Sequence, residues 1–367
     1  MRLELHRRPR ASHAMALASP LLAIALTLVT GAILFALLGK DPVRALQAYF
    51  VEPLSTGYAL QELGVKAAPL VLIGIGLAIC FRCNAWNIGA EGQLTAGAIA
   101  GSWLVLSAPD WDSPLVLPLM LALGALGGLL YGLVPAVLKT RFNANEILTS
   151  LMLVYVAQLA LDYLVRGPWR DPEGFNFPQS MLFPAAAQLP LLLPDGRLHI
   201  GALFALLAVL GGAVLLGRTV LGFEIRVAGE APRAAAFAGF SRTRLVLFAF
   251  AASGALAGLA GILEVAGPIG QLLPSVSPGY GFAAIIVAFL ARLNPFGVLF
   301  AGLLLALSYI GGEHAQIALG IPRNITQVFQ GILLFYVLAC DSLILYRPRL
   351  VSRRADAAAE AEAHGRA

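Results

Sequence analysis

The stretch RCNAWNIGAEGQ, residues Arg82–Gln93, interrupts an otherwise apolar part of the chain and is the best guide to its fold. Apolar runs flank it on both sides, over Ala67–Phe81 and Leu94–Leu106. Polar groups at membrane depth are expensive, so they usually mark a cavity, a pathway or an internal contact. The stretch therefore predicts the end of one membrane segment and the start of a broken or re-entrant one. Its polar side chains include Asn84, Asn87, Glu91 and Gln93.

The composition is that of a membrane protein. Of 367 residues, 59% are hydrophobic and 12% are charged, whereas soluble domains are about a quarter charged. Several apolar runs are about 20 residues long, enough to cross a bilayer as helices, and helices satisfy their own backbone hydrogen bonds in lipid. We therefore predict an all-α, polytopic membrane protein. The net charge of +5 comes from arginines in the loops and does not indicate a nucleic-acid partner.

About ten apolar segments are candidates to span the membrane. With both termini cytoplasmic, most of the 25 arginine and lysine residues fall on the inside, as is usual for membrane proteins. We expect residues 1–345 to form a transmembrane domain with a cytoplasmic loop at 218–244, and residues 346–367 to form a cytoplasmic tail. The ten segments are Ala14–Leu38, Val65–Phe81, Ile88–Ser107, Leu115–Leu138, Ile147–Val165, Ile200–Leu216, Leu245–Val265, Gly281–Ala291, Phe296–Ile310 and Ile325–Cys340.

Glycines recur at helical contact spacing within these segments. Membrane helices associate through such faces because small residues let two backbones approach closely. The pattern predicts that the helices pack as one bundle. The pairs are Gly97/Gly101, Gly124/Gly128, Gly128/Gly132 and Gly254/Gly258.

Two glycine-broken segments echo each other in the two halves of the chain, at Trp86–Gly101 and Ser277–Arg292. Paired interrupted segments of this kind point to a translocation site at the interface of two repeats. We therefore expect an internal repeat, although the sequence identity between the two segments is low.

The opening stretch allows two interpretations. Asn87 is placed to cap a helix that starts at Ile88, and Glu91 then lies in the first turn, where its charge suits the positive helix end. Asn87, Glu91 and Gln93 either line the pathway or lock a bent helix without touching a solute. Further along, Asn143 and Glu146 have the spacing of a capping box, with a contact to a partner or to the pathway as the alternative.

A third polar stretch, Gly222–Ser241, lies on the predicted cytoplasmic side. Pro232 suits the first turn of a short helix over Arg233–Ala238, which Gly239 can end. A short helix with charged flanks in a large cytoplasmic loop can dock into a groove on a soluble partner. The alternative is a surface loop without a partner.

Motifs for catalysis are missing from the sequence. It has no G-x-x-x-x-G-K-[ST] loop, no H-E-x-x-H and no G-x-S-x-G. Cys80 and Cys83 form a lone C-x-x-C, short of the four ligands that structural zinc needs. We expect no enzymatic activity, no cofactor and no metal in this chain.

Five stretches together resemble one family, the branched-chain amino-acid/ribose-type permease subunits of ABC importers, and within it the nucleoside/simple-sugar permeases. The likeness covers about Leu63 to Cys340, with Trp86 where phenylalanine is commoner. The stretches are Trp86–Gln93, Ala144–Met152, Arg166–Ser180, Val227–Gly239 and Tyr280–Gly297.

The resemblance implies a ten-helix permease in the bacterial inner membrane that works with a second, similar permease, a cytoplasmic ATP-binding subunit and an external substrate-binding lipoprotein. It matches Gly229–Gly239 to the coupling helix that enters the ATPase. Candidate pathway residues are Asn87, Glu91, Gln93, Asn145, Glu146, Tyr280 and Phe282. Candidate coupling residues are Gly229, Glu230, Pro232, Arg233, Ala234, Phe237 and Gly239.

The alternative function is a stand-alone secondary transporter or channel for a small polar solute. Such a protein needs carboxylates within the membrane that couple transport to an ion, and Glu146, Asp162 and Glu264 are the candidates. An integral membrane enzyme is a weaker alternative, because no catalytic constellation supports it.

Overall fold

Helices make up nearly all the regular structure of the protein. A computed structural model describes residues 2–7, 13–193, 195–320, 322 and 324–351. These residues divide into two units, one made of both ends of the chain, 1–46 and 324–367, and the other of residues 47–323. Helix α2, Pro42–Phe50, crosses the division.

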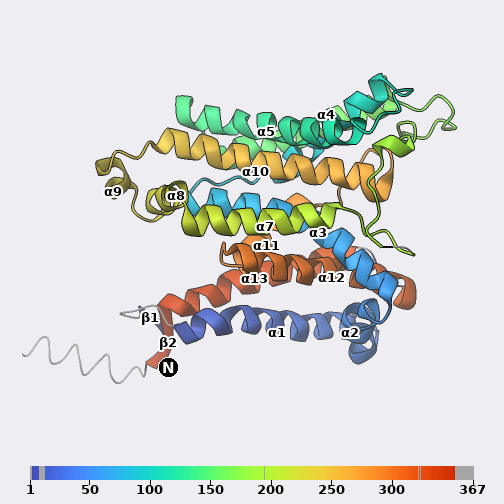
Figure 1. The fold of residues 1–367 in the computed structure, drawn as a ribbon. Helices are drawn as coiled ribbons and strands as arrows, with labels where there is room; N and C mark the ends of the chain where they lie inside the picture. Colours follow the sequence, from blue (N-terminus) through green and yellow to red (C-terminus); the bar gives the residue numbers. More distant parts are fainter. Residues whose placement is uncertain (1, 8–12, 194, 321, 323, 352–367) are drawn as a thin grey trace, which may run out of the picture. The chain divides into compact units, whose positions relative to one another are not determined.

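The larger unit, residues 47–323, contains the predicted functional segments (Figure 1). Its elements are the short 3-10 helices η1 (Glu52–Leu54) and η2 (Ala185–Ala187), the π-helix η3 (Val265–Ile269), and the helices α3 (Gly57–Arg82), α4 (Ala90–Ser107), α5 (Val116–Phe142), α6 (Glu146–Arg166), α7 (Gly201–Arg218), α8 (Val220–Glu230), α9 (Pro232–Phe237), α10 (Arg242–Glu264), α11 (Tyr280–Leu290) and α12 (Pro295–Leu319).

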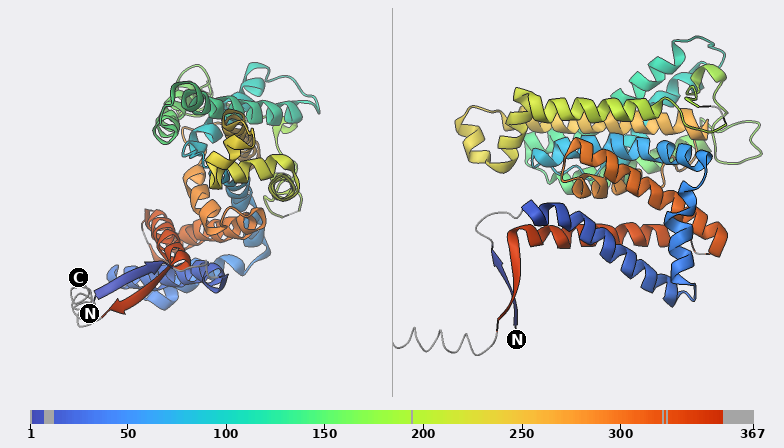
Figure 2. Two further views of the ribbon diagram at one scale, coloured as in Figure 1. Left: turned by 90° about the vertical axis from the view of Figure 1, so that its left-hand side faces the viewer. Right: turned by 60° about the horizontal axis from the view of Figure 1, so that its bottom comes forward.

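The smaller unit pairs helix α1, His13–Leu37, with helix α13, Asn324–Leu345. The Thr30 and Tyr336 hydroxyls are 2.8 Å apart. Beyond the helices, strands β1 (Arg2–Arg7) and β2 (Tyr346–Val351) pair in antiparallel register (Figure 2). Neither strand is predicted from the sequence, and β2 lies in the expected tail at 346–367. Residues 352–367 of that tail lie outside the described residues.

Helix α3 is the centre of the larger unit. It packs against α7, α10, α11 and α12 and is buried over almost all of its length from Val65 to Phe81. A helix that is apolar on every side belongs inside a bundle, in contact with other helices all round. Gly76 lets α3 approach α10 closely, since a Cβ there would lie 2.8 Å from the Cα of Ser253.

Helices α4, α5 and α10 meet through the predicted glycine faces. A Cβ on Gly258 of α10 would lie 2.7 Å from the Cα of Gly128 on α5 and would also strike Gly124. A Cβ on Gly97 of α4 would strike Gly258 itself. The prediction that these glycines pack the bundle is therefore confirmed.

All ten predicted spans coincide with helices, but the helices differ in length. Seven of those described are long and apolar enough to cross a membrane, and two apolar helices, at Tyr280–Leu290 and Gln327–Cys340, are shorter. The α4 helix is 18 residues long and is outside both groups. The protein is thus a multi-pass helical membrane protein.

The long irregular segment between α6 and α7 is held against the chain that follows η3. Ser180 donates its backbone N–H to the carbonyl of Leu272 at 3.0 Å, and its Oγ accepts from the Leu272 N–H at 2.9 Å. Near its end, Arg197 binds the Glu62 carboxylate through two hydrogen bonds of 2.9 and 2.6 Å. The segment is therefore irregular but anchored at both of these points.

We expect His199, at the end of this segment, to make the protein less stable in acid. Its side chain is 3% exposed, and burial lowers its pKa from 6.5 to about 4, with the Glu62 carboxylate opposing the shift. The unfolded chain therefore takes up a proton as the pH falls below 6.5, whereas the folded protein does so only near pH 4. The resulting loss of stability is about 2 kcal/mol between pH 8 and about pH 5.

Thermal unfolding in detergent across this pH range tests the prediction. The Nδ1 atom of His199 accepts from the Gly201 N–H at 3.1 Å, a bond that asparagine can reproduce. The His199→Asn variant should show a flatter pH dependence than the wild type. Equal slopes for the two proteins would contradict the role assigned to His199.

Candidate functional site

The predicted break between two membrane helices is present. Helix α3 ends at Arg82, and Asn84 adopts a left-handed backbone with φ of 52°. Helix α4 begins at Ala90, with Gly89 as a cap that has no side-chain hydrogen bond. The prediction of a helix that starts at Ile88 under an Asn87 cap is therefore wrong, and the Asn87 side-chain Oδ1 instead accepts from the Gly89 N–H at 3.1 Å, before the helix begins.

The Asn87 and Gln93 side chains bind each other. Each amide donates to the other's carbonyl oxygen, at 2.9 and 3.0 Å, and Asn87 also donates to the Ser253 hydroxyl at 3.0 Å. All three residues are buried. Such closed polar networks fix one arrangement of a core, so this one supports the interpretation of a lock on the bent segment. Ser253 was missed because nothing marks it within an apolar helix.

Glu91 connects the two glycine-broken segments. Its carboxylate accepts from the N–H of Gly281, in the first turn of α11, at 2.6 Å. Gly281 has no room for a side chain, because a Cβ there would strike the backbone of Glu91. Ser277 lies just before the same helix, and its hydroxyl accepts from the Tyr280 N–H at 2.8 Å. The starts of α4 and α11 thus meet, with the Glu91 carboxyl group beside the free backbone N–H groups at the start of α11.

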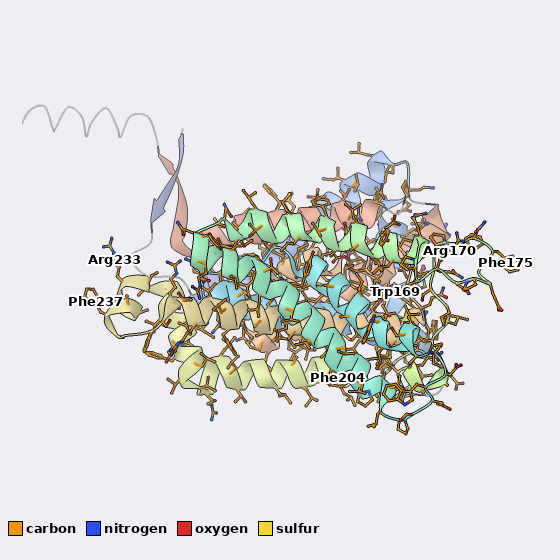
Figure 3. All side chains as sticks on the ribbon, turned by 90° about the horizontal axis from the view of Figure 1, so that it is seen from above. Trp169, Arg170, Phe175, Phe204, Arg233 and Phe237 are labelled. Carbon is orange, nitrogen blue, oxygen red and sulfur yellow. The ribbon has the colours of Figure 1, made fainter. Side chains whose placement is uncertain are left out.

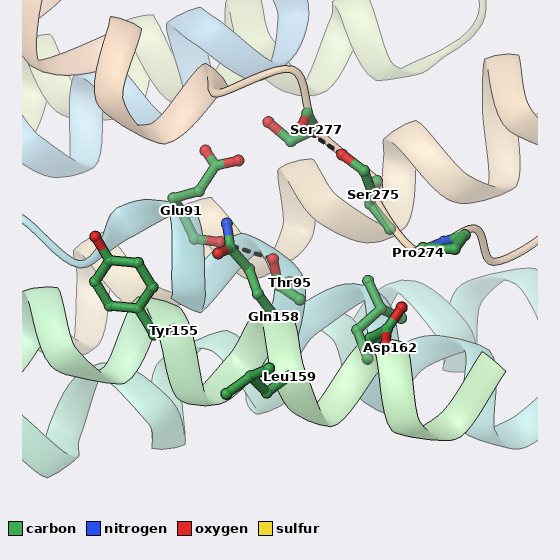
Figure 4. A pocket seen from close by; sticks show the side chains of 11 residues that line it. Glu91, Thr95, Tyr155, Gln158, Leu159, Asp162, Pro274, Ser275 and Ser277 are labelled. Atoms are coloured by element: carbon green, nitrogen blue, oxygen red, sulfur yellow. Dashed lines mark hydrogen bonds between the residues drawn. The ribbon is translucent and has the colours of Figure 1, made fainter. Parts of the chain in front are cut away.

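A cavity of about 350 Å³ lies beside this junction (Figure 4). Glu91 and Thr95 of α4 form one side of it, and Tyr155, Gln158 and Asp162 of α6 face them. The remaining wall is the loop 274–277. Carboxylate, amide and hydroxyl groups together with an aromatic ring can hydrogen-bond and stack a polar organic molecule.

Of the predicted pathway residues, Glu91 lines this cavity and the others do not. Asn145 caps α6, accepting from the Ile147 N–H at 2.9 Å, and Glu146 forms an ion pair with Lys139. The predicted Asn143 cap is wrong: Asn143, with φ of 52°, ends α5 instead. Asn145, two residues later, is the residue that caps α6.

The other two predicted pathway residues lie on α11. Tyr280 is fully buried, with its ring edge-on to that of Tyr309 at 5.4 Å between centroids. Phe282 is half-exposed. A role for either in the pathway remains a prediction.

The predicted docking helix is present as α9, Pro232–Phe237, with Gly239 in a left-handed conformation just after it. Figure 3 shows Arg233 and Phe237 projecting from one end of the larger unit, and Trp169, Arg170 and Phe175 at the opposite end. The Phe237 side chain is 94% exposed. An exposed phenylalanine on a short helix is suited to a pocket on another protein.

Comparison with known proteins gives a consistent family. Residues 59–338 match the family described as "branched-chain amino acid transport system / permease component". The glucose ABC transporter permease of Haloferax volcanii is 36% identical, covering 100% of this chain and 99% of that protein. The guanosine ABC transporter permease of Bacillus subtilis is 31% identical, covering 87% and 92%. The nucleoside ABC transporter permease of Lactococcus lactis is 29% identical, covering 87% and 89%. No solved structure matches the chain.

Proposed function

Because this chain belongs to the branched-chain amino acid transport system permease family, we propose that it imports a nucleoside or a related simple sugar together with a second, similar permease. It is the membrane permease subunit of an ABC importer, and a separate subunit hydrolyses the ATP. The solute is proposed because the relatives carry names for glucose, nucleoside and guanosine transport. The external partner is a substrate-binding lipoprotein.

The proposed topology has ten spans in a bacterial inner membrane and both termini in the cytoplasm. The bias of arginine and lysine residues supports it. The placement of α9 and of the segment 166–199 at opposite ends of the larger unit agrees with it (Figure 3). In this topology α9 faces the ATP-binding subunit, and the segment 166–199 faces the external binding protein.

The cavity beside Glu91 is the proposed solute pathway. The observation that carries this assignment is the polar face of α6, where Tyr155, Gln158 and Asp162 line the cavity on a helix apolar enough to span a membrane. The Tyr155 ring is 56% exposed. Polar side chains within a membrane face a bundle interior or water, seldom lipid, so this face borders a passage shared with the second permease.

The alternative of a stand-alone secondary transporter receives less support. Two of its three candidate carboxylates are neutralised locally, Glu146 by Lys139 and Asp162 by Arg166. Glu264 is buried at the junction of α10 and the π-helix η3. The family relationship favours an ATP-driven importer.

We expect the Gln158→Leu variant to lower ATP-driven uptake about tenfold in proteoliposomes that contain both permeases, the ATP-binding subunit and the binding protein. Leucine keeps the volume of the side chain but removes a hydrogen bond to solute, a loss of roughly 1.4 kcal/mol. Uptake of labelled nucleosides and pentoses is the measurement. Uptake by this chain alone on an ion gradient would refute the importer.

The matched control is Gln316→Leu, which removes an exposed amide on α12 that does not line the cavity. Its uptake should equal that of the wild type. If both variants transport normally while uptake still requires ATP, the protein is an importer but the cavity is not its solute pathway.

A further inference from the structure

Three arginines converge on a groove at the end of α3. The groove, called here the arginine groove, has a volume of about 640 Å³. Arg82 enters it from the end of α3, Arg226 from α8, and Arg292 from the turn after α11. None of the interpretations of the solute pathway uses these residues.

The residues that line the arginine groove carry more positive than negative groups. Glu230 is the single carboxylate among its lining residues, against the three guanidinium groups. Arg226 and Glu230 are exposed, and the Arg226 side chain donates to the Leu216 carbonyl at 3.1 Å. Like charges held close together repel one another, so an arrangement that gathers them favours an anionic occupant.

The backbone of the arginine groove is held in a fixed shape. Asn84, Arg292 and Leu293 line it with φ values of 52°, 53° and 58°. Left-handed backbone is unfavourable at Arg292 and Leu293 and persists only where the surroundings enforce it. Gly229 packs its backbone on the carbonyl of Arg82, with no room there for a Cβ. The guanidinium groups are therefore carried on a rigid frame, which is suited to a specific partner.

We propose that the arginine groove binds a carboxylate-bearing segment of the ATP-binding subunit, as a second contact beside α9. The proposal rests on the proposed function. Gly229 and Glu230 of the groove lie three and two residues before Pro232, where α9 begins, so a subunit that receives α9 covers the neighbouring surface. Arginine binds carboxylates through two parallel hydrogen bonds, and the excess positive charge selects an acidic segment.

Through this contact the ATP-binding subunit would bind the permease at two places. One is α8 with α9, and the other is the end of α3, which directly precedes the break at residues 83–89 and the Glu91 junction. Closure of the ATPase would then move the coupling helix and the α3–α4 break together. A subunit that bound α9 alone would make no direct contact with α3.

The test measures binding of the ATP-binding subunit to the permease complex in nanodiscs as a function of salt. The Arg226→Gln variant and the Arg82→Gln variant should each weaken binding about tenfold at low salt, with a smaller difference at high salt where charges are screened. Arg218→Gln removes an exposed arginine from the end of α7, outside the groove, and should bind like the wild type.

A photo-cross-linking residue in place of Asn84, which is exposed in the arginine groove, supplies an independent readout. It should give an adduct with the ATP-binding subunit. Adducts with lipid alone, or wild-type affinity in both groove variants, would overturn the proposal and leave the importer intact. Failure of the wild-type complex to bind the ATP-binding subunit would instead refute the proposed function.

Discussion

Replacing Gly229–Gly239 by a flexible linker of equal length is expected to reduce ATP-driven uptake to background while the protein still inserts into the membrane. The segment contributes α9, whose Phe237 and Arg233 project away from the helical bundle (Figure 3). ATP binding can shift the permease only through contacts that differ between its states. Without α9 those contacts are lost, so ATP hydrolysis proceeds without solute movement.

A pair of exposed phenylalanines separates docking from a general surface effect. Phe237 on α9 is 94% exposed, and Phe175 at the opposite end of the same unit is 93% exposed. The Phe237→Ser variant should bind the ATP-binding subunit more weakly, because buried aromatic anchors dominate interface energies. The Phe175→Ser variant should bind it normally. Normal uptake by the linker variant would remove the coupling role from this segment.

The helices were predictable because their signals are local. Apolar length located every predicted span, and Pro232 with Gly239 located α9 to within one residue at each end. The prediction for Asn87 failed because a distant residue binds its side chain. Asn87 does not cap α4, because its amide binds Gln93 and Ser253, the latter 166 positions away. Local capping rules consider only nearby backbone groups, so they cannot predict a contact with a residue so distant in the sequence.

The candidate site was predictable only in part, for the same reason. The glycine-broken segments are visible in the sequence, but their contact joins Glu91 to Gly281, 190 positions apart. Tyr155, Gln158 and Asp162 were visible only as polar interruptions of an apolar segment. That these three residues line one cavity becomes visible only in the structure, where α6 lies opposite α4 and the loop 274–277. The strands β1 and β2 likewise depend on pairing between the two ends of the chain.

The meeting of the two broken segments also explains why the stretch Arg82–Gln93 is polar. The side chains of Asn87 and Gln93 form their hydrogen bonds within the core. Glu91 instead binds the backbone at the start of α11 and borders the cavity. The stretch Arg82–Gln93 thus contains both the hydrogen-bonded pair that fixes the bend and one wall of the proposed pathway. A displacement of the end of α3 would reach both α4 and α11 through it.

The Gly258→Val variant is expected to prevent accumulation of folded protein. Gly258 lies where α4, α5 and α10 converge, and a Cβ there would lie 2.7 Å from the Cα and 2.8 Å from the N of Gly128. These are backbone atoms, which no rotamer change can move aside. Valine adds a Cβ and two methyl groups to this contact, so α10 and α5 must separate. Overpacking usually costs about 1–3 kcal/mol, and a clash with backbone atoms of α5 at both Gly124 and Gly128 should exceed that range.

Gly211→Val is the matched control, because it places the same side chain on a glycine of another spanning helix, α7, with no atom within 4 Å of its Cβ. Its thermal stability in detergent and its elution in size-exclusion chromatography should match those of the wild type. The contrast between the two variants isolates helix contact from the lower helix propensity of valine, which both share. A stable, monodisperse Gly258→Val protein would show that α4, α5 and α10 do not pack through this glycine face.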